Sequence, residues 1–212
     1  MKEIEPKKTF LALPLEKQRR ILETAATEFA LKGFQGASLN AIVERVGIAK
    51  GSLYQYFDDK QHLFLYVFDY GIRLAKDALK EIKSKEVSVF EQIRSSLVTG
   101  FRFVQRHPLI YQTYLKILFE NKVPLREKLI STLRFYSHKY LLPLLEKAQK
   151  KGEIRPDIDL KLAAFMLDAV MERFLQAYTL AYVDSIGIYK ADDETINKLV
   201  NAWIGILKKG LS

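Results

Sequence analysis

Residues 38–64 read SLNAIVERVGIAKGSLYQYFDDKQHLF, and they have the anatomy of a helix-turn-helix. Ser38 is a good N-cap for a short first helix, and Ile42 lies on the apolar face of that helix. Gly47 allows a tight turn, after which Leu53 is placed to hold the next helix against the first. The pattern therefore predicts two short helices packed across one turn.

The second of these helices has a polar side that the packing between the two helices does not use. This side carries Lys50, Gly51, Tyr54 and Gln55. An exposed helix of this kind can enter the major groove of DNA, where the edges of the four base pairs are distinguishable. The sequence therefore predicts a surface that recognises DNA.

The same residues resemble the TetR family of bacterial regulators. The resemblance is carried by GIAKGSLYQYFDDKQHLF, residues 47–64, and extends from about Lys17 to Tyr66. The glycine turn, the Lys-Gly-Ser segment and the Leu-Tyr-x-Tyr-Phe segment all follow the family pattern. Val43 and Val46 depart from it, because small alanines are common there in relatives. This departure predicts slightly wider packing between the two helices.

The resemblance implies a role for each polar residue around the turn. Base edges would be met by Lys50, Gly51 and Tyr54, with Asn40 as a weaker candidate. Phosphates would be contacted mainly by Ser38, Ser52, Gln55, Tyr56 and Lys60. The chemistry agrees, because Lys, Ser and Tyr side chains donate hydrogen bonds to phosphate oxygens. In the alternative interpretation, the two tyrosines are core aromatics with solvated hydroxyls and Lys50 is an ordinary surface charge.

The whole chain predicts an all-α fold of about nine helices, because helical spacing recurs along it and no segment shows sustained strand-like alternation. We expect an N-terminal three-helix DNA-binding domain with the helix-turn-helix at residues 1–62. A C-terminal helical domain for ligand binding and dimerisation is expected at residues 63–212.

Several helix ends are predicted from single residues. Gly33 should follow the end of the first helix, and Pro143 should bend or split a later one. Asp159 can cap a helix that runs to about Val183, and Asp193 can cap the last helix.

Composition and charge exclude several classes of protein. The net charge of +9 permits nucleic-acid binding, but residues 1–60 hold 10 basic and 8 acidic residues, a net charge of only +2. Cysteine is absent, which excludes disulfides and thiolate zinc sites. The three histidines show no metal-ligand spacing, and no nucleophile motif or glycine-rich phosphate loop is present. We therefore expect no metal, no cofactor and no enzymatic activity.

The N-terminal segment has no apolar block fit for export, and no apolar stretch approaches the roughly 20 residues that cross a bilayer. The sequence therefore predicts a cytoplasmic protein without a membrane partner.

The last helix carries an apolar stripe of Ile196, Leu199, Val200, Trp203, Ile204 and Leu207. With the helix of residues 162–182 it could form a four-helix bundle across a two-fold axis, as is typical of the resembled family. Such a homodimer suits an inverted-repeat operator in double-stranded DNA, because its two DNA-binding domains then meet successive turns of the duplex. The alternative is that the stripe is only core within one chain.

Aromatic residues are dense in the middle of the chain and could line an apolar ligand cavity. The candidate lining residues are Phe101, Tyr111, Tyr114, Phe135, His138, Phe174 and Tyr178. The alternative is that these aromatics are plain core. If a cavity exists, a small, largely apolar inducer would favour a dimer shape whose two DNA-binding domains no longer fit two successive grooves of the DNA.

The sequence thus predicts a transcriptional regulator, with repression as the family default. The competing hypothesis is a helical protein that binds small molecules and has lost its affinity for DNA.

Overall fold

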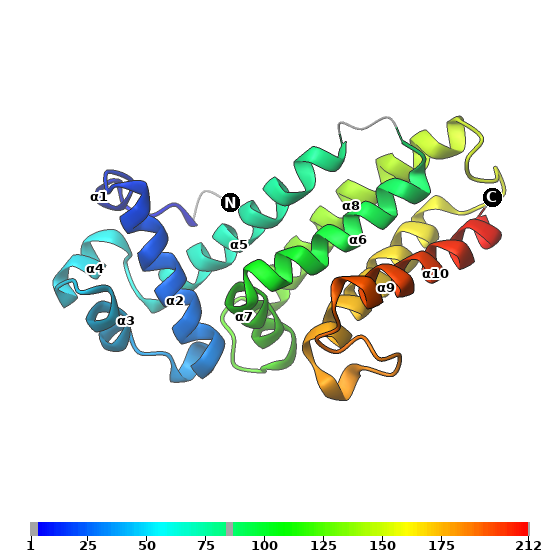
Figure 1. The fold of residues 1–212 in the computed structure, drawn as a ribbon. Helices are drawn as coiled ribbons and strands as arrows, with labels where there is room; N and C mark the ends of the chain where they lie inside the picture. The colour runs from blue at the N-terminus through cyan, green and yellow to red at the C-terminus, as the bar shows by residue number, and fades with distance from the viewer. Residues whose placement is uncertain (1–3, 84–86, 212) are drawn as a thin grey trace. The chain divides into compact units, whose positions relative to one another are not determined.

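The computed structural model describes residues 4–83 and 87–211, and these residues are mostly helical (Figure 1). They contain ten α-helices and no β-strand, so the all-α prediction is confirmed. The additional helix is α1 (Lys8–Leu11), a single turn that the apolar pattern did not predict.

The chain divides into two compact units. The first comprises the chain up to Lys76 together with Arg106–Ile130, and the second comprises Asp77–Gln105 together with the chain from Ser131 onward. The first unit holds α1, α2 (Leu15–Gly36), α3 (Leu39–Val46), α4 (Lys50–Tyr56), α7 (Pro108–Phe119) and most of α5 (Lys60–Lys83). The second holds most of α6 (Val89–Arg106) and α8 (Arg126–Lys150), with α9 (Leu160–Thr179) and α10 (Asp193–Leu211). The functional boundary expected at residue 62 stays a prediction.

The core of the first unit is aromatic. Phe29 of α2 and Phe64 of α5 are both almost fully buried, and their rings meet edge to face at 5.0 Å. Phe34 adds a third ring, 5.2 Å from that of Phe64. Ile42 of α3 is completely buried as well. The aromatic rings pack α2 against α5, and α3 packs against α2. Burial of each such side chain contributes roughly 1.5–3 kcal/mol.

Gly33 interrupts α2 with non-helical backbone angles, as predicted for a residue that follows a helix end. It has a left-handed φ of 65°, yet α2 resumes and continues to Gly36, so the glycine makes a kink inside the helix. A Cβ at this position would lie 2.8 Å or less from both carboxylate oxygens of Glu120. Glycine is therefore favoured by the positive φ, whereas the flexible carboxylate of Glu120, the C-cap residue of α7, can move away from an added side chain.

The core of the second unit has two clusters, which α10 helps to build. Phe101 of α6 and Phe174 of α9 pack with Ile196 and Val200 of α10, and Trp203 lies against both clusters. Part of the predicted apolar stripe is thus core within one chain.

Two predicted helix ends in this unit are corrected. Pro143 lies inside α8 without splitting it, so the predicted split is wrong and the predicted bend stays a prediction. Asp159 caps α9 as expected, but α9 ends at Thr179 and a 3₁₀ turn follows at Ala181–Val183. The cap of α10 is Asp192 rather than Asp193, and its Oδ1 accepts the backbone N–H of Thr195 at 2.8 Å.

Candidate nucleic-acid interface

The helix-turn-helix is formed by α3 and α4, as the sequence predicted. Ser38 caps α3 by accepting the backbone N–H of Ala41 at 3.4 Å, and Gly47 ends the helix with a left-handed φ of 73°. Leu53 is buried in the seam between the two helices. Val43 and Val46 are buried too, so α3 uses the larger side chains to fill its inner face.

The polar side of α4 faces solvent. Lys50, Gly51 and Gln55 are exposed, Tyr54 keeps 44% of its surface accessible, and Ser52 is half-buried. Asn40 is exposed on α3, next to its half-buried cap Ser38. An added Cβ at Gly51 would meet nothing within 4 Å, so the α4 backbone is open to a close approach. Seven of the nine residues predicted to contact DNA therefore share an accessible or half-accessible surface.

Tyr56 and Lys60 are placed differently from that surface. Tyr56 is 7% exposed, and its ring meets Phe10 edge to face at 5.9 Å. The ammonium of Lys60 donates to the carbonyl oxygens of Gln35 and Ala37, both at 3.1 Å, and lies over the ring of Phe34. Both residues therefore have structural roles that the pattern did not reveal, and their phosphate contacts stay predictions.

Residues 5–10, called here the N-terminal brace, hold the far end of α4. Lys7 donates through its backbone N–H to Tyr56 O at 3.0 Å and through Nζ to Tyr54 O at 2.9 Å. The hydroxyl of Thr9 donates to Gln55 O. The last three carbonyls of α4, which have no partner within the helix, are thus all paired with the brace.

The brace is itself fixed by aromatic packing and charge. Phe10 is fully buried, with ring centroids 4.9 Å from Phe57 and 5.6 Å from Tyr66. Lys7 also pairs with Asp58 at 2.8 Å, and this hydrogen bond lowers the pKa of the Asp58 carboxyl below its usual value. Sequence reasoning missed the brace, and its only local sign was Phe10, an aromatic residue outside the predicted helices.

A buried carboxylate joins α2 to α3. Glu28 is 3% exposed and accepts the backbone N–H of Ser38 at 3.1 Å and the guanidinium of Arg45 at 3.0 Å. The first bond holds the N-cap residue and the second holds the last turn of α3. Glu28 therefore fixes both ends of the helix that supports α4.

The seven predicted ligand residues do not form one group. Phe101, Phe174 and Tyr178 pack together in the second unit, with centroid distances from Phe101 of 6.4 and 5.4 Å. Tyr111 and Tyr114 form a separate pair in the first unit. Phe135 and His138 are exposed. These residues therefore belong to separate packing groups, and ligand binding by any of them stays a prediction.

Membrane-spanning helices and metal-binding clusters are both absent from the part of the chain that the structure describes. No described helix is long and apolar enough to cross a membrane. Within residues 4–83 and 87–211, no group of three or more His, Asp or Glu side chains is arranged to hold a metal ion.

Comparison with known proteins matches both parts of the chain to one family. Residues 21–67 match the family described as bacterial regulatory proteins, tetR family, and residues 87–212 match the tetracyclin repressor-like C-terminal domain. A probable acrEF/envCD operon repressor of Escherichia coli (strain K12) is 24% identical over 209 residues, which cover 88% of this chain and 92% of the relative.

Solved structures support the same family assignment. A TetR family transcriptional regulator from Chloroflexus aurantiacus J-10-FL is 30% identical, with a TM-score of 0.73 and 98% of each chain covered. The fold is also that of FadR from Bacillus subtilis in complex with stearoyl-CoA, which is 19% identical with a TM-score of 0.73, over 92% of this chain and 99% of FadR. The helix-turn-helix geometry and these matches give the same answer: the chain belongs to the TetR family of DNA-binding transcriptional regulators.

Proposed function

We propose that this protein is a homodimeric repressor that binds an inverted-repeat operator and is released from it by a small-molecule ligand. The observation that carries the DNA part is the solvent-facing row of Lys50, Gly51, Tyr54 and Gln55 on α4. A seven-residue helix is too short to be stable alone, and the N-terminal brace together with the buried seam at Leu53 holds it in place. Family membership supports action in the bacterial cytoplasm, where the operator lies.

The residues of this row can contact DNA in different ways. Tyr54 and Lys50 carry donors that suit base edges or phosphates, and the bare backbone at Gly51 permits close contact. Arg45 places a further charge at the end of α3, with its side chain 48% exposed although it is bonded to Glu28. Attraction to phosphates would make the complex weaken steeply as the salt concentration rises.

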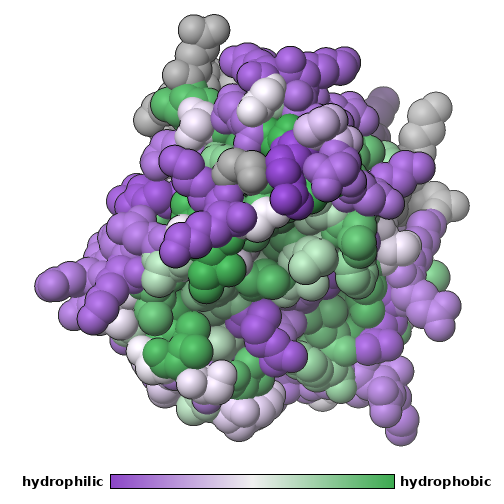
Figure 2. Space-filling model, turned by 90° about the vertical axis from the view of Figure 1, so that its right-hand side faces the viewer, coloured by the Kyte–Doolittle hydropathy of each residue, from purple (hydrophilic) through white to green (hydrophobic). Residues whose placement is uncertain are grey.

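Dimerisation is supported by apolar side chains that remain exposed on α9 and α10. Leu162, Phe165 and Met166 of α9 and Ile206 of α10 are between 56% and 69% exposed. Figure 2 shows hydrophobic side chains gathered on one face between hydrophilic borders. Water contact with a contiguous apolar surface is unfavourable, and a second copy of the chain would cover it. The two-fold dimer also matches two half-sites in DNA.

Release by a ligand is supported by the family and by relatives such as FadR, whose structure contains stearoyl-CoA. A ligand that binds one dimer shape more tightly than the other lowers operator affinity by that difference. The competing function, a small-molecule-binding protein without DNA affinity, would leave the exposed row on α4 without a role.

The test is to select duplexes that bind the protein from a random pool and then measure two matched variants. Tyr54→Ala should weaken binding to the selected duplex by about 1–3 kcal/mol, a factor of roughly 5 to 150. Tyr189→Ala is the control, because Tyr189 is 39% exposed and belongs to the second unit. Its binding should equal that of the unmodified protein. A pool that yields no enriched inverted repeat, or equal binding by Tyr54→Ala, would overturn the proposal.

A further inference from the structure

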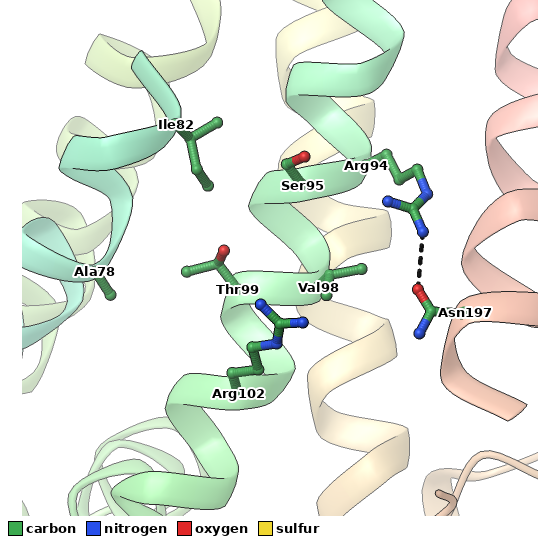
Figure 3. A pocket seen from close by; sticks show the side chains of 8 residues that line it. All are labelled: Ala78, Ile82, Arg94, Ser95, Val98, Thr99, Arg102 and Asn197. Carbon is green, nitrogen blue, oxygen red and sulfur yellow. Dashed lines mark hydrogen bonds between the residues drawn. The ribbon is translucent and has the colours of Figure 1, made fainter. Parts of the chain in front are cut away.

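A hollow of about 250 Å³ lies within the second unit, between α5, α6 and α10 (Figure 3). Its lining includes two arginines, two hydroxyl side chains and one asparagine, with three small or branched apolar residues behind them. None of the described lining residues is acidic. The hollow is smaller than a typical pocket for a drug-sized ligand, about 300–1,000 Å³, and its charge is positive.

Arg94 is held in a fixed orientation at one end of this hollow. Its Nε donates to Oδ1 of Asn201 at 2.7 Å and its Nη2 donates to Oδ1 of Asn197 at 2.8 Å, the second bond being drawn in Figure 3. Carboxamide oxygens orient the guanidinium without neutralising it. Glu91 is the one carboxylate paired with it among the described residues, at 3.4 Å, and Glu91 does not line the hollow.

Arg102 stands two turns further along the same helix. It is exposed, and no hydrogen bond or ion pair joins it to any side chain that the structure describes. Figure 3 shows its guanidinium extending along α6 toward Val98, in the direction of Arg94. Eight residues of α-helix separate the two Cα atoms by about 12 Å, which two arginine side chains can bridge through a bound group. Thr99 lies between them and offers a hydroxyl donor.

We propose that this hollow is a binding site for a small anion, with a phosphate or carboxylate group held between Arg94 and Arg102. Arginine is always charged and its fork of donors matches both groups. The apolar residues behind, including Ala78 and Ile82 of α5, would contact a short organic portion of the ligand. The proposed ligand is thus anionic, unlike the largely apolar inducer expected from the aromatic residues.

The site also suggests how an inducer could act, and this step rests on the proposed function. α5 is one continuous helix whose first residue, Lys60, bonds to the end of α2, and whose later residues Ala78 and Ile82 line the hollow. An anion that draws α6 and α10 together against α5 would favour one position of this helix. Its differential affinity would then bias the DNA-binding helices.

The experiment uses calorimetric titration of the full protein without DNA, at constant ionic strength in sodium chloride. One arm adds inorganic phosphate and the other adds hexanoate, so that the two anion chemistries are separated. We expect saturable binding in at least one arm. Arg102→Gln should weaken anion binding at least tenfold, because the guanidinium charge and its hydrogen-bond donors are lost. The fold should persist, because Arg102 is exposed.

The matched control is Arg106→Gln, which removes an exposed arginine of the same helix that does not line the hollow. It should bind the anion as the unmodified protein does. Absence of saturable binding in both arms, or equal weakening by the two variants, would overturn the anion site. Binding of both variants to the selected duplex without anion is measured in parallel. Normal DNA binding with no anion binding would remove this inference and leave the proposed function standing.

Discussion

The ammonium nitrogen of Lys7 lies 2.9 Å from the carbonyl oxygen of Tyr54, although 47 residues separate them in the sequence. The contact joins the N-terminal brace to α4, whose exposed side chains we propose to read DNA. Thr9 and the backbone of Lys7 pair with the two carbonyls that follow. The proposed DNA-reading surface is therefore a property of α4 and the brace together.

Replacing Thr9 by valine should weaken operator binding without any change in charge. The variant loses the hydroxyl donor to Gln55, a hydrogen bond worth roughly 0.5–1.5 kcal/mol. We expect a loss of up to about tenfold in affinity for the selected duplex. The salt dependence of binding should equal that of the unmodified protein, because no charge is changed. Fluorescence anisotropy of labelled DNA measures the affinity.

The contribution of Lys7 to the brace is tested against its neighbour Lys8. Lys7→Met should lose more affinity than Lys8→Met, because the neighbouring Lys8 is exposed and has no bond to α4. Equal losses would mean that both lysines act only by attracting phosphates. In that case the brace would not position α4.

Gly51→Ala should separate stability from DNA binding. The added methyl group meets nothing within 4 Å, and alanine favours the helix, so the free energy of unfolding should stay constant or rise by up to about 1 kcal/mol. Operator affinity should nevertheless fall, because the methyl group stands where the backbone approaches DNA. Gly47→Ala should instead lower the free energy of unfolding by about 1–2 kcal/mol, because alanine does not favour the left-handed φ of 73° at this position. Denaturant unfolding measures the stability of each variant, and fluorescence anisotropy measures its affinity for the selected duplex. Full operator affinity in Gly51→Ala would contradict a close approach of the α4 backbone to DNA.

Phe165→Asp should weaken the homodimer and leave the helices intact. Phe165 is 69% exposed in the single chain, so the fold does not depend on its burial. A charge placed in an apolar interface is costly, and we expect the dimer dissociation constant to rise at least tenfold. Sedimentation equilibrium measures it, and circular dichroism checks the helices. Leu15→Asp is the control, because Leu15 is 82% exposed on α2 of the first unit and should not affect association. Unchanged association in Phe165→Asp would place the interface elsewhere.

His107 should make the protein less stable as the pH falls below about 6.5. Burial lowers the pKa of its imidazole from the ordinary value of 6.5, and the nearby Arg106 lowers it further while Glu23 opposes the shift. The folded state therefore binds this proton less readily than the unfolded state. Its contribution to stability is complete above the unfolded pKa and is lost as the pH falls through the lower folded pKa.

The measurement compares the free energy of unfolding at pH 7.5 and pH 5.5. The difference should shrink in His107→Asn and stay unchanged in His138→Asn, because His138 is exposed. If His107→Asn keeps the full pH dependence, other groups are responsible for it.

Much of the DNA-reading motif was determined by the sequence alone. The cap at Ser38, the left-handed turn at Gly47 and the polar side of α4 depend on residues close together in the chain. Local hydrogen bonds and helical periodicity control such features, so the pattern was sufficient to predict them. The same spacing explains why the all-α fold was predicted correctly.

Only the tertiary structure decided which of the predicted residues are free to act. Tyr56 has the spacing of a surface residue, but Phe10 of the brace covers it. Arg94 is oriented by Asn197 and Asn201, more than 100 positions away. Helical periodicity fixes the side of a helix on which a residue lies, whereas its partners depend on packing between distant segments, which no local pattern encodes.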